Sequence, residues 1–102
     1  MLHLTLRQLE IFTAVVHSGS TVAAAPVVAL SQSATSAALQ QFESGLGAPL
    51  FERAGRGLVL NDAGRALLPQ ALALLEQARA IEQAFGAQGA GLPVRRIVRD
   101  VQ

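Results

Sequence analysis

The sequence predicts a mainly α-helical fold in which three short helices and a small two-stranded hairpin precede one longer helix. Helices are indicated by apolar side chains that recur at three- and four-residue steps, with a capping residue before each run. The hairpin is indicated by two short apolar runs on either side of a glycine-rich turn at residues 54–57. The chain has 102 residues, of which 51% are hydrophobic, so it has the size of one ordinary domain and enough apolar material for one core.

The first helix is expected to begin after Thr5 and to end at Gly19. Thr5 and Gln8 have the spacing of a capping box, in which each side chain satisfies a free backbone N–H at the helix start. Four apolar residues at helical spacing predict its inward face, namely Leu6, Leu9, Phe12 and Val16.

The second helix is expected to be short and irregular. Ser20 is a suitable N-cap for a helix over 21–29. Pro26 lies beyond the first turn, where its missing N–H removes a helical hydrogen bond, so we expect a kink.

The third helix is expected to begin after Ser31 and to end at Gly45 and Gly47. Its inward stripe is predicted to be Thr35, Leu39, Phe42 and Leu46. The opposite face carries only small or amide side chains, namely Gln32, Ser33, Ser36, Ala37 and Gln40. Because a solvated helix face usually carries Lys and Glu, this face is predicted to approach a partner closely.

The hairpin is predicted to combine strands 50–53 and 58–60 and to carry arginine at its tip. The net charge is only +1, and all eight basic residues are arginine. Arg53, Arg56 and Arg65 lie within a stretch of 13 residues that has Asp62 as its one acidic residue. Positive charge is therefore concentrated at the hairpin, with a second group of arginines in the C-terminal tail.

The fourth helix is expected to begin after Asn61 or Asp62 and to run to about Phe85, with Pro69 bending or breaking it. One apolar stripe comprises Leu67, Ala71, Leu74, Ala78, Ile81 and Phe85, and a neighbouring stripe comprises Leu68, Leu72 and Leu75. Together the two stripes form a wider apolar surface than the core of one small domain can bury. We therefore predict a homodimer in which the fourth helices pair.

Several classes of protein are disfavoured by composition. The chain has no cysteine, and His3 and His17 have no second ligand at metal-binding spacing, so we expect no metal site and no cofactor. No nucleophile, base and orienting acid occur together, which disfavours a hydrolase or another enzyme. The sequence has neither a signal peptide nor a membrane-spanning apolar run, and we expect a cytoplasmic protein. Residues 86–93 have a linker's composition and residues 94–102 have no helical or strand period, so 87–102 are expected to form a flexible tail.

Three helices followed by an arginine-tipped hairpin is the element order of a winged helix-turn-helix, and the ordered series of motifs resembles the N-terminal signature of LysR-type transcriptional regulators. The resemblance covers residues 4–86. It rests on Leu6-Arg7-Gln8-Leu9, Gly19-Ser20, Ala24-Ala25, Ser31-Gln32-Ser33-Ala34, Leu46-Gly47, Leu50-Phe51-Glu52-Arg53 and Leu60-Asn61-Asp62-Ala63-Gly64, with Phe12, Ser36, Leu39, Glu43 and Arg56 between them.

The resemblance implies a DNA-binding domain over residues 1–60, with its helix-turn-helix between Ser20 and Gly45, and a linker or dimerisation helix over 61–86. The third helix then enters the major groove of double-stranded DNA and presents Gln32, Ser33, Ser36, Ala37 and Gln40 to the bases. Arg53 and Arg56 on the wing, together with Ser31, lie beside phosphates. Two fourth helices pair in the dimer on a partly symmetric operator.

This sequence departs from the family pattern at Ala37, at Thr35, where many relatives have an aliphatic residue, at Pro26, which is unusual for the second helix, and in its length. Many relatives have arginine at the position of Ala37, so one strong guanine-reading group is missing. Family members also continue into subdomains that bind a small-molecule inducer, and nothing after Gly91 resembles them, so we expect no effector domain and no inducer site in this chain. Two alternatives remain open: an interaction module that pairs with a full-length relative, and a molybdate-responsive regulator with a similar winged module.

Overall fold

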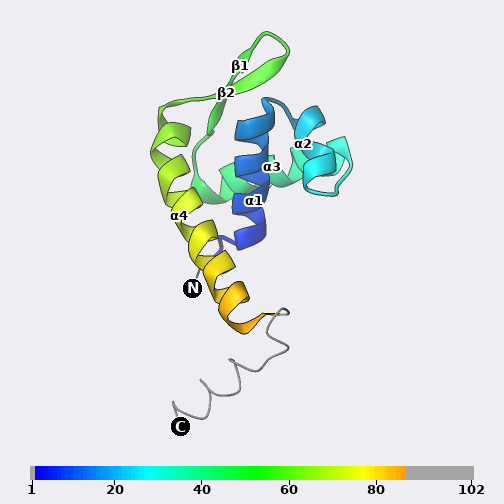
Figure 1. Ribbon diagram of the computed structural model, residues 1–102. Coiled ribbons are helices and arrows are strands. Elements are labelled where there is room, and N and C mark those ends of the chain that lie inside the picture. Colours follow the sequence, from blue (N-terminus) through cyan, green and yellow to red (C-terminus); the bar gives the residue numbers. More distant parts are fainter. Residues whose placement is uncertain (1, 87–102) are drawn as a thin grey trace.

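The computed structural model describes residues 2–86, which form four helices and one two-stranded sheet (Figure 1). In chain order the elements are α1 (Leu6–Ser18), α2 (Thr21–Val27), α3 (Gln32–Leu46), β1 (Phe51–Ala54), β2 (Gly57–Leu60) and α4 (Asp62–Phe85). The expected mainly α-helical fold with a small hairpin is confirmed.

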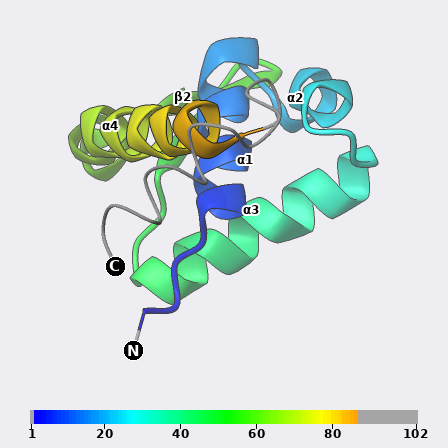
Figure 2. The same cartoon turned by 60° about the horizontal axis from the view of Figure 1, so that its bottom comes forward.

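Helix α1 is the central element, with α4 along one side, α2 along the other and α3 crossing beneath (Figures 1 and 2). One core cluster joins Leu9 and Phe12 of α1 to Phe42, Leu50, Ala71 and Leu75. A second joins Ile11, Ala14 and Val15 of α1 to Ala24, Val28 and Leu39. The expectation of a single inward face was therefore incomplete. The predicted inward face was also wrong at Leu6, which is the first residue of the helix and is 48% exposed.

The capping residues predicted for α1 and α3 are confirmed. Thr5 and Gln8 form the reciprocal capping box, and Ser31 accepts a hydrogen bond from the N–H of Ala34. Gly47 ends α3 in the left-handed conformation, whereas Gly45 lies inside the helix, contrary to expectation. The predicted inward stripe of α3 is buried except for its last member, Leu46, which is 45% exposed because it is the final residue of the helix.

Helix α2 is shorter than predicted because it ends at Val27, one residue after Pro26. The turn that follows contains Ala29 in the left-handed conformation, with φ of 60°. Arg7 of α1 donates a hydrogen bond to the carbonyl oxygen of Val28 at this turn. The turn between α2 and α3 is thereby attached to the start of α1.

The hairpin pairs β1 with β2 in antiparallel register from Phe51–Leu60 to Ala54–Gly57. Compared with the predicted strands, β1 begins and ends one residue later and β2 begins one residue earlier. Leu50 precedes the strand and is only 2% exposed, because it belongs to the core. The N–H of Leu58 donates to the carbonyl oxygen of Gly19, 2.8 Å away, and so ties the hairpin to the end of α1.

Helix α4 begins after Asn61, whose side chain accepts from the N–H of Gly64, and it continues through Pro69 without the break that the proline predicted. It packs in the core through Ala71 and Leu75, near its middle. Among residues 2–86, no single helix is long and apolar enough to span a membrane; one pair, α2 with α3, passes on length and composition but is bent by 102°.

Gly64 lies where α4 packs closely against Leu50 and Leu60, so a larger residue at this position should destabilise the fold. A β-carbon at Gly64 would overlap the carbonyl oxygen of Leu50 and lie 2.6 Å from Cδ2 of Leu60. We expect Gly64→Ala to lower the free energy of unfolding by about 1–3 kcal/mol, the usual cost of overpacking. Gly45→Ala is the matched control, since a β-carbon there meets nothing within 4 Å; it should raise stability by about 0.5–1 kcal/mol. Urea unfolding followed by circular dichroism tests both, and equal stabilities of the two variants would contradict the prediction.

Candidate nucleic-acid interface

The predicted base-facing residues of α3 all reach the surface. Gln32, Ser33, Ala37 and Gln40 are exposed, and Ser36 is partly exposed. Thr35 and Leu39 lie between them in sequence and are buried on the opposite face. Helix α3 therefore has one side in the core and an uncharged side open to a partner, as its sequence predicted.

Hydrogen bonds at the start of α3 fix the position of this surface. Oγ of Ser31 accepts from the N–H of Ala34 at 3.1 Å and lies 3.3 Å from Oγ of Ser33. The buried Thr35 hydroxyl donates to the carbonyl oxygen of Ser31 at 2.8 Å. Ser31 is thus the N-cap of the helix, and its exposed hydroxyl lies at the end where helical N–H groups favour an anion.

A groove joins α3 to the start of α2 and to the hairpin. From α3 it is lined by Gln32, Ser36, Leu39, Gln40 and Glu43, and the Glu43 carboxylate accepts a hydrogen bond from the N–H of Leu50 at 2.7 Å. The hairpin contributes Arg53 and Arg56, and α2 with its cap contributes Ser20, Thr21 and Val22. Ser33 and Ala37, which are also exposed, are not among the residues that line it. Three predicted base-facing residues and both predicted wing arginines therefore share one concave surface.

The residues from α2 were not identified from the sequence. Thr21 and Val22 follow the N-cap Ser20 in an otherwise apolar helix, and only the packing of α2 against α3 places them beside Gln32. Nε2 of Gln32 lies 3.3 Å from Oγ1 of Thr21 and donates to it. This hydrogen bond orients the Gln32 amide and leaves its oxygen free to accept from another group.

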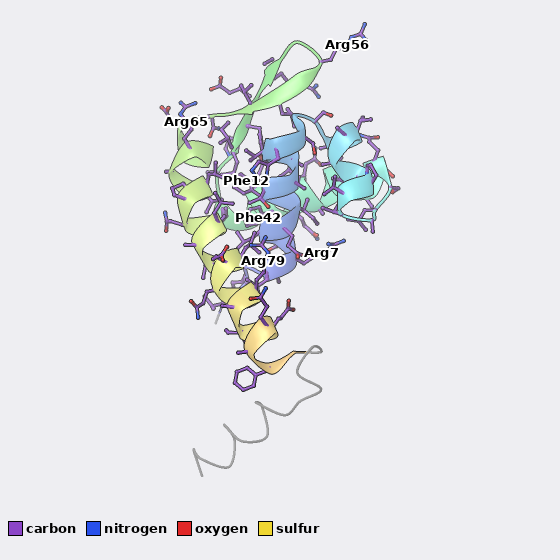
Figure 3. The ribbon with its side chains drawn as sticks, viewed as in Figure 1. Arg7, Phe12, Phe42, Arg56, Arg65 and Arg79 are labelled. Atoms are coloured by element: carbon purple, nitrogen blue, oxygen red, sulfur yellow. The ribbon has the colours of Figure 1, made fainter. Side chains whose placement is uncertain are left out.

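Arg53 and Arg56 of the hairpin differ from the other arginines of residues 2–86 because no side chain or backbone group in this part of the chain pairs with them. Arg7, Arg65 and Arg79 form ion pairs with Glu10, Asp62 and Glu76. In this part of the chain, Arg53 and Arg56 make neither an ion pair nor a hydrogen bond. Arg56 extends away from the body of the domain at the hairpin tip (Figure 3). The two unneutralised cations next to α3 make this face attractive to anions.

The predicted dimerisation residues of α4 separate into two groups. Ala71 is fully buried in the protomer's own core and Leu67 packs against that core, so Ala71 was wrongly expected to face a partner. Ala78 is half-buried. Leu74, Ile81 and Phe85 are 47%, 53% and 43% exposed. Steps of seven and eleven residues are close to whole helical turns, so these three side chains share one face.

Residues 2–86 contain no group of three His, Asp or Glu side chains that could hold a metal ion. His3 and His17 are both exposed and lie at opposite ends of α1. Arg95, Arg96 and Arg99, and the tail predicted for residues 87–102, lie outside the described residues.

Comparison with protein families matches residues 6–65 to the model described as bacterial regulatory helix-turn-helix protein, lysR family. A protein from Escherichia coli K12, described as an uncharacterized HTH-type transcriptional regulator, YeiE, is 60% identical over 84 residues, which cover 82% of this chain and 29% of that protein. The RuBisCO operon transcriptional regulator of Allochromatium vinosum is 39% identical over 82 residues, which cover 80% of this chain and 27% of that protein. This chain therefore spans less than a third of the length of either relative.

Solved structures with similar folds include complexes with DNA. The crystal structure of the CbnR_DBD-DNA complex matches with a TM-score of 0.73 and 38% identity, covering 78% of this chain and 92% of that one. The crystal structure of the BenM_DBD/benA site 1 DNA complex matches with a TM-score of 0.74 and 30% identity, covering 78% of this chain and 90% of that one.

Proposed function

Because this chain belongs to the LysR family of bacterial regulatory helix-turn-helix proteins, we propose that it is a transcription regulator that binds a partly symmetric operator in double-stranded DNA as a homodimer. The observation that carries the proposal is the groove in which the uncharged face of α3 meets the two unpaired arginines of the hairpin. The relatives are named as transcriptional regulators, in keeping with the lack of a catalytic constellation in the sequence. We place its site of action in the cytoplasm, where bacterial DNA is found.

In this proposal α3 lies in the major groove and reads base edges. Gln32 and Gln40 carry amides that pair with the donor and acceptor of adenine, while Ser33 and Ser36 bond to base edges or phosphate. Ala37 presents a methyl group to thymine. None of these side chains carries a net charge, so this part of α3 meets no repulsion from the phosphates. Glu43, the one acidic residue of the helix, accepts a hydrogen bond from the N–H of Leu50.

The wing supplies the electrostatic part of the binding. Arg53 and Arg56 contact phosphates beside α3, and Ser31 does so at the helix N-terminus. Neutralising a phosphate releases bound counterions, so these contacts make the affinity depend on salt. The two arginines need not break an ion pair first, since they have none within residues 2–86.

The exposed apolar face of α4 supports dimerisation. Leu74, Ile81 and Phe85 lie in the second half of the helix, on a side that the protomer's own core leaves open. Full burial of such a side chain is worth about 1.5–3 kcal/mol, and roughly half of that remains to be gained here because each side chain is already about half-buried in the protomer. Half-buried Ala78 and Leu67 flank this face. The two domains of the dimer then present their α3 helices to successive major grooves.

Replacing Ser36 with Glu tests the proposed reading face. A carboxylate at this partly exposed position would face the phosphates, and like charges brought together at an interface cost several kcal/mol, so the affinity for DNA should fall at least about 100-fold. Ser44→Glu is the matched control: it makes the same charge change on the same helix at an exposed residue outside the groove. Electrophoretic mobility shifts measure both variants, and equal losses would show that α3 does not face DNA through Ser36.

Replacing Arg53 and Arg56 with Ala tests the wing. Each substitution should lower the slope of log affinity against log salt by about 0.9, the value expected for one phosphate contact. Arg79→Ala removes the same charge from α4 but breaks an existing ion pair, and its slope should match that of the unaltered chain. Fluorescence anisotropy between 50 and about 200 mM salt covers the sensitive range. Unchanged slopes would exclude the two arginines from the phosphate contacts, and no salt-dependent binding by the unaltered chain would favour an interaction module.

The double substitution Leu74→Arg with Ile81→Arg tests the dimer. It removes two apolar side chains from the exposed face of α4 and should weaken the dimer at least about 100-fold, on the scale of two buried aliphatic groups. Ala73→Arg with Ala80→Arg adds the same charges to exposed residues about a quarter turn away and should leave the dimer intact. Sedimentation equilibrium gives both dissociation constants. A dimer that survives the first pair would place the interface on another surface.

A further inference from the structure

Val22 is an exposed apolar residue on the surface assigned to DNA. Its side chain is 66% exposed at the second position of α2, next to the N-cap Ser20 and Thr21. It lines the groove together with Gln32, Ser36 and the two wing arginines. Helix α2 packs in the core through Ala24 and Ala25, so Val22 lies on the side of the helix that faces away from the core of residues 2–86. Its methyl groups are therefore available to whatever fills the groove.

The side chains around Val22 carry a restricted set of base-reading groups. Helices α2 and α3 together contain neither Lys nor Arg, and Glu43 is their one ionisable residue. The bidentate contact by which proteins most often recognise guanine needs an arginine or lysine, so these two helices cannot provide it. They offer amides, hydroxyls and methyl groups instead.

We propose that Val22 is a further specificity-determining residue, which contacts the C5-methyl group of a thymine and makes the chain select an operator half-site rich in A·T pairs. This inference rests on the proposed function and specifies the class of DNA that the same groove accepts. The thymine methyl is the one apolar group that a base pair displays in the major groove. Of the apolar side chains that line this groove, Val22 and Pro49 are exposed, whereas Leu39 is buried and Phe51 and Leu58 are partly buried. Val22 is the one that adjoins Thr21, to which Gln32 is hydrogen-bonded.

Gln32 supplies the complementary adenine contact in the same half-site. Because its Nε2 donates to Thr21, the amide is held against α2 beside Val22. Its Oε1 accepts from the adenine N6 amino group, and the second hydrogen of Nε2 donates to adenine N7. An A·T pair and a neighbouring T·A pair thus satisfy Gln32 and Val22 together, whereas a G·C pair at either position offers no methyl group and no matching amino donor on the purine.

Val27 provides a control of the same residue type on the same helix. It is 69% exposed, nearly the same as Val22. It lines a different groove, between α1, α2 and α4, with Arg7, His17 and Leu72. Substituting alanine at either valine removes exposed methyl groups without creating a cavity, so both variants should keep the fold of the unaltered chain.

The test compares thymine with uracil, which lacks the C5-methyl group. Selection of bound sequences from random duplexes by the complete 102-residue chain first defines the half-site. Each selected thymine is then replaced in turn by deoxyuridine, with its adenine partner kept, and dissociation constants are measured by fluorescence anisotropy at one salt concentration. The unaltered chain and Val27→Ala should lose about three- to fivefold in affinity at one of these thymines, the scale of one buried methyl-sized group. Val22→Ala should bind the thymine and uracil duplexes equally at that position.

Three results would overturn the inference while leaving the proposed function standing: a selected half-site dominated by G·C pairs, salt-dependent binding with no selected sequence, or uracil sensitivity that Val22→Ala retains in full. Absence of salt-dependent binding to any duplex would instead contradict the proposed function itself, and the inference with it.

Discussion

The arrangement of every other element depends on the burial of α1 on two opposite sides. Leu9 and Phe12 pack against residues from α3 and α4, while Ile11 and Val15 pack against α2 and α3. The rings of Phe12 and Phe42 (Figure 3) meet edge to face with centroids 6.1 Å apart. The ring centroid of Phe51, from the hairpin, lies 5.6 Å from that of Phe12. A helix held from both sides cannot shift without disturbing both clusters, so it serves as the fixed reference for the DNA-facing elements.

Hydrogen bonds at the two ends of α1 extend this constraint to the parts that face DNA. At the C-terminal end, the carbonyl oxygen of Gly19 accepts from the N–H of Leu58 and so attaches β2 to the end of α1. At the N-terminal end, Arg7 donates to Val28 in the turn between α2 and α3. The wing arginines and the face of α3 are thereby held at a set separation, although about twenty residues separate them in the sequence. A preorganised surface loses less conformational entropy when it binds a rigid duplex.

The distribution of charge makes the hairpin attractive to anions although the chain as a whole is only weakly charged. The net charge of +1 would by itself be poor evidence for a nucleic-acid partner. Within residues 2–86, however, the arginines on α1 and α4 are neutralised by nearby carboxylates, and the two on the hairpin are not. Since exposed ion pairs contribute little to stability, their main consequence is to confine the effective positive field to the wing. Placement, rather than the total charge, is what supports the proposed function.

The sequence by itself determined the local features, because these depend on residues three or four positions apart. The capping box at Thr5, the N-cap at Ser31 and the uncharged face of α3 follow from short-range hydrogen bonds and helical periodicity. Pro26 and Pro69 show the limit of such rules. Helix α2 ends just after Pro26, whereas α4 continues through Pro69, because the core contacts of α4 offset the hydrogen bond that the proline removes.

Which apolar residues of α4 are buried depends instead on tertiary structure. Ala71 and Leu74 belong to the same periodic stripe, yet only Ala71 meets the core, because α1 covers one side of α4 and leaves the other open. Val22 likewise joins the groove only because α2 packs against α3, a contact between residues too distant in sequence for any local pattern to record.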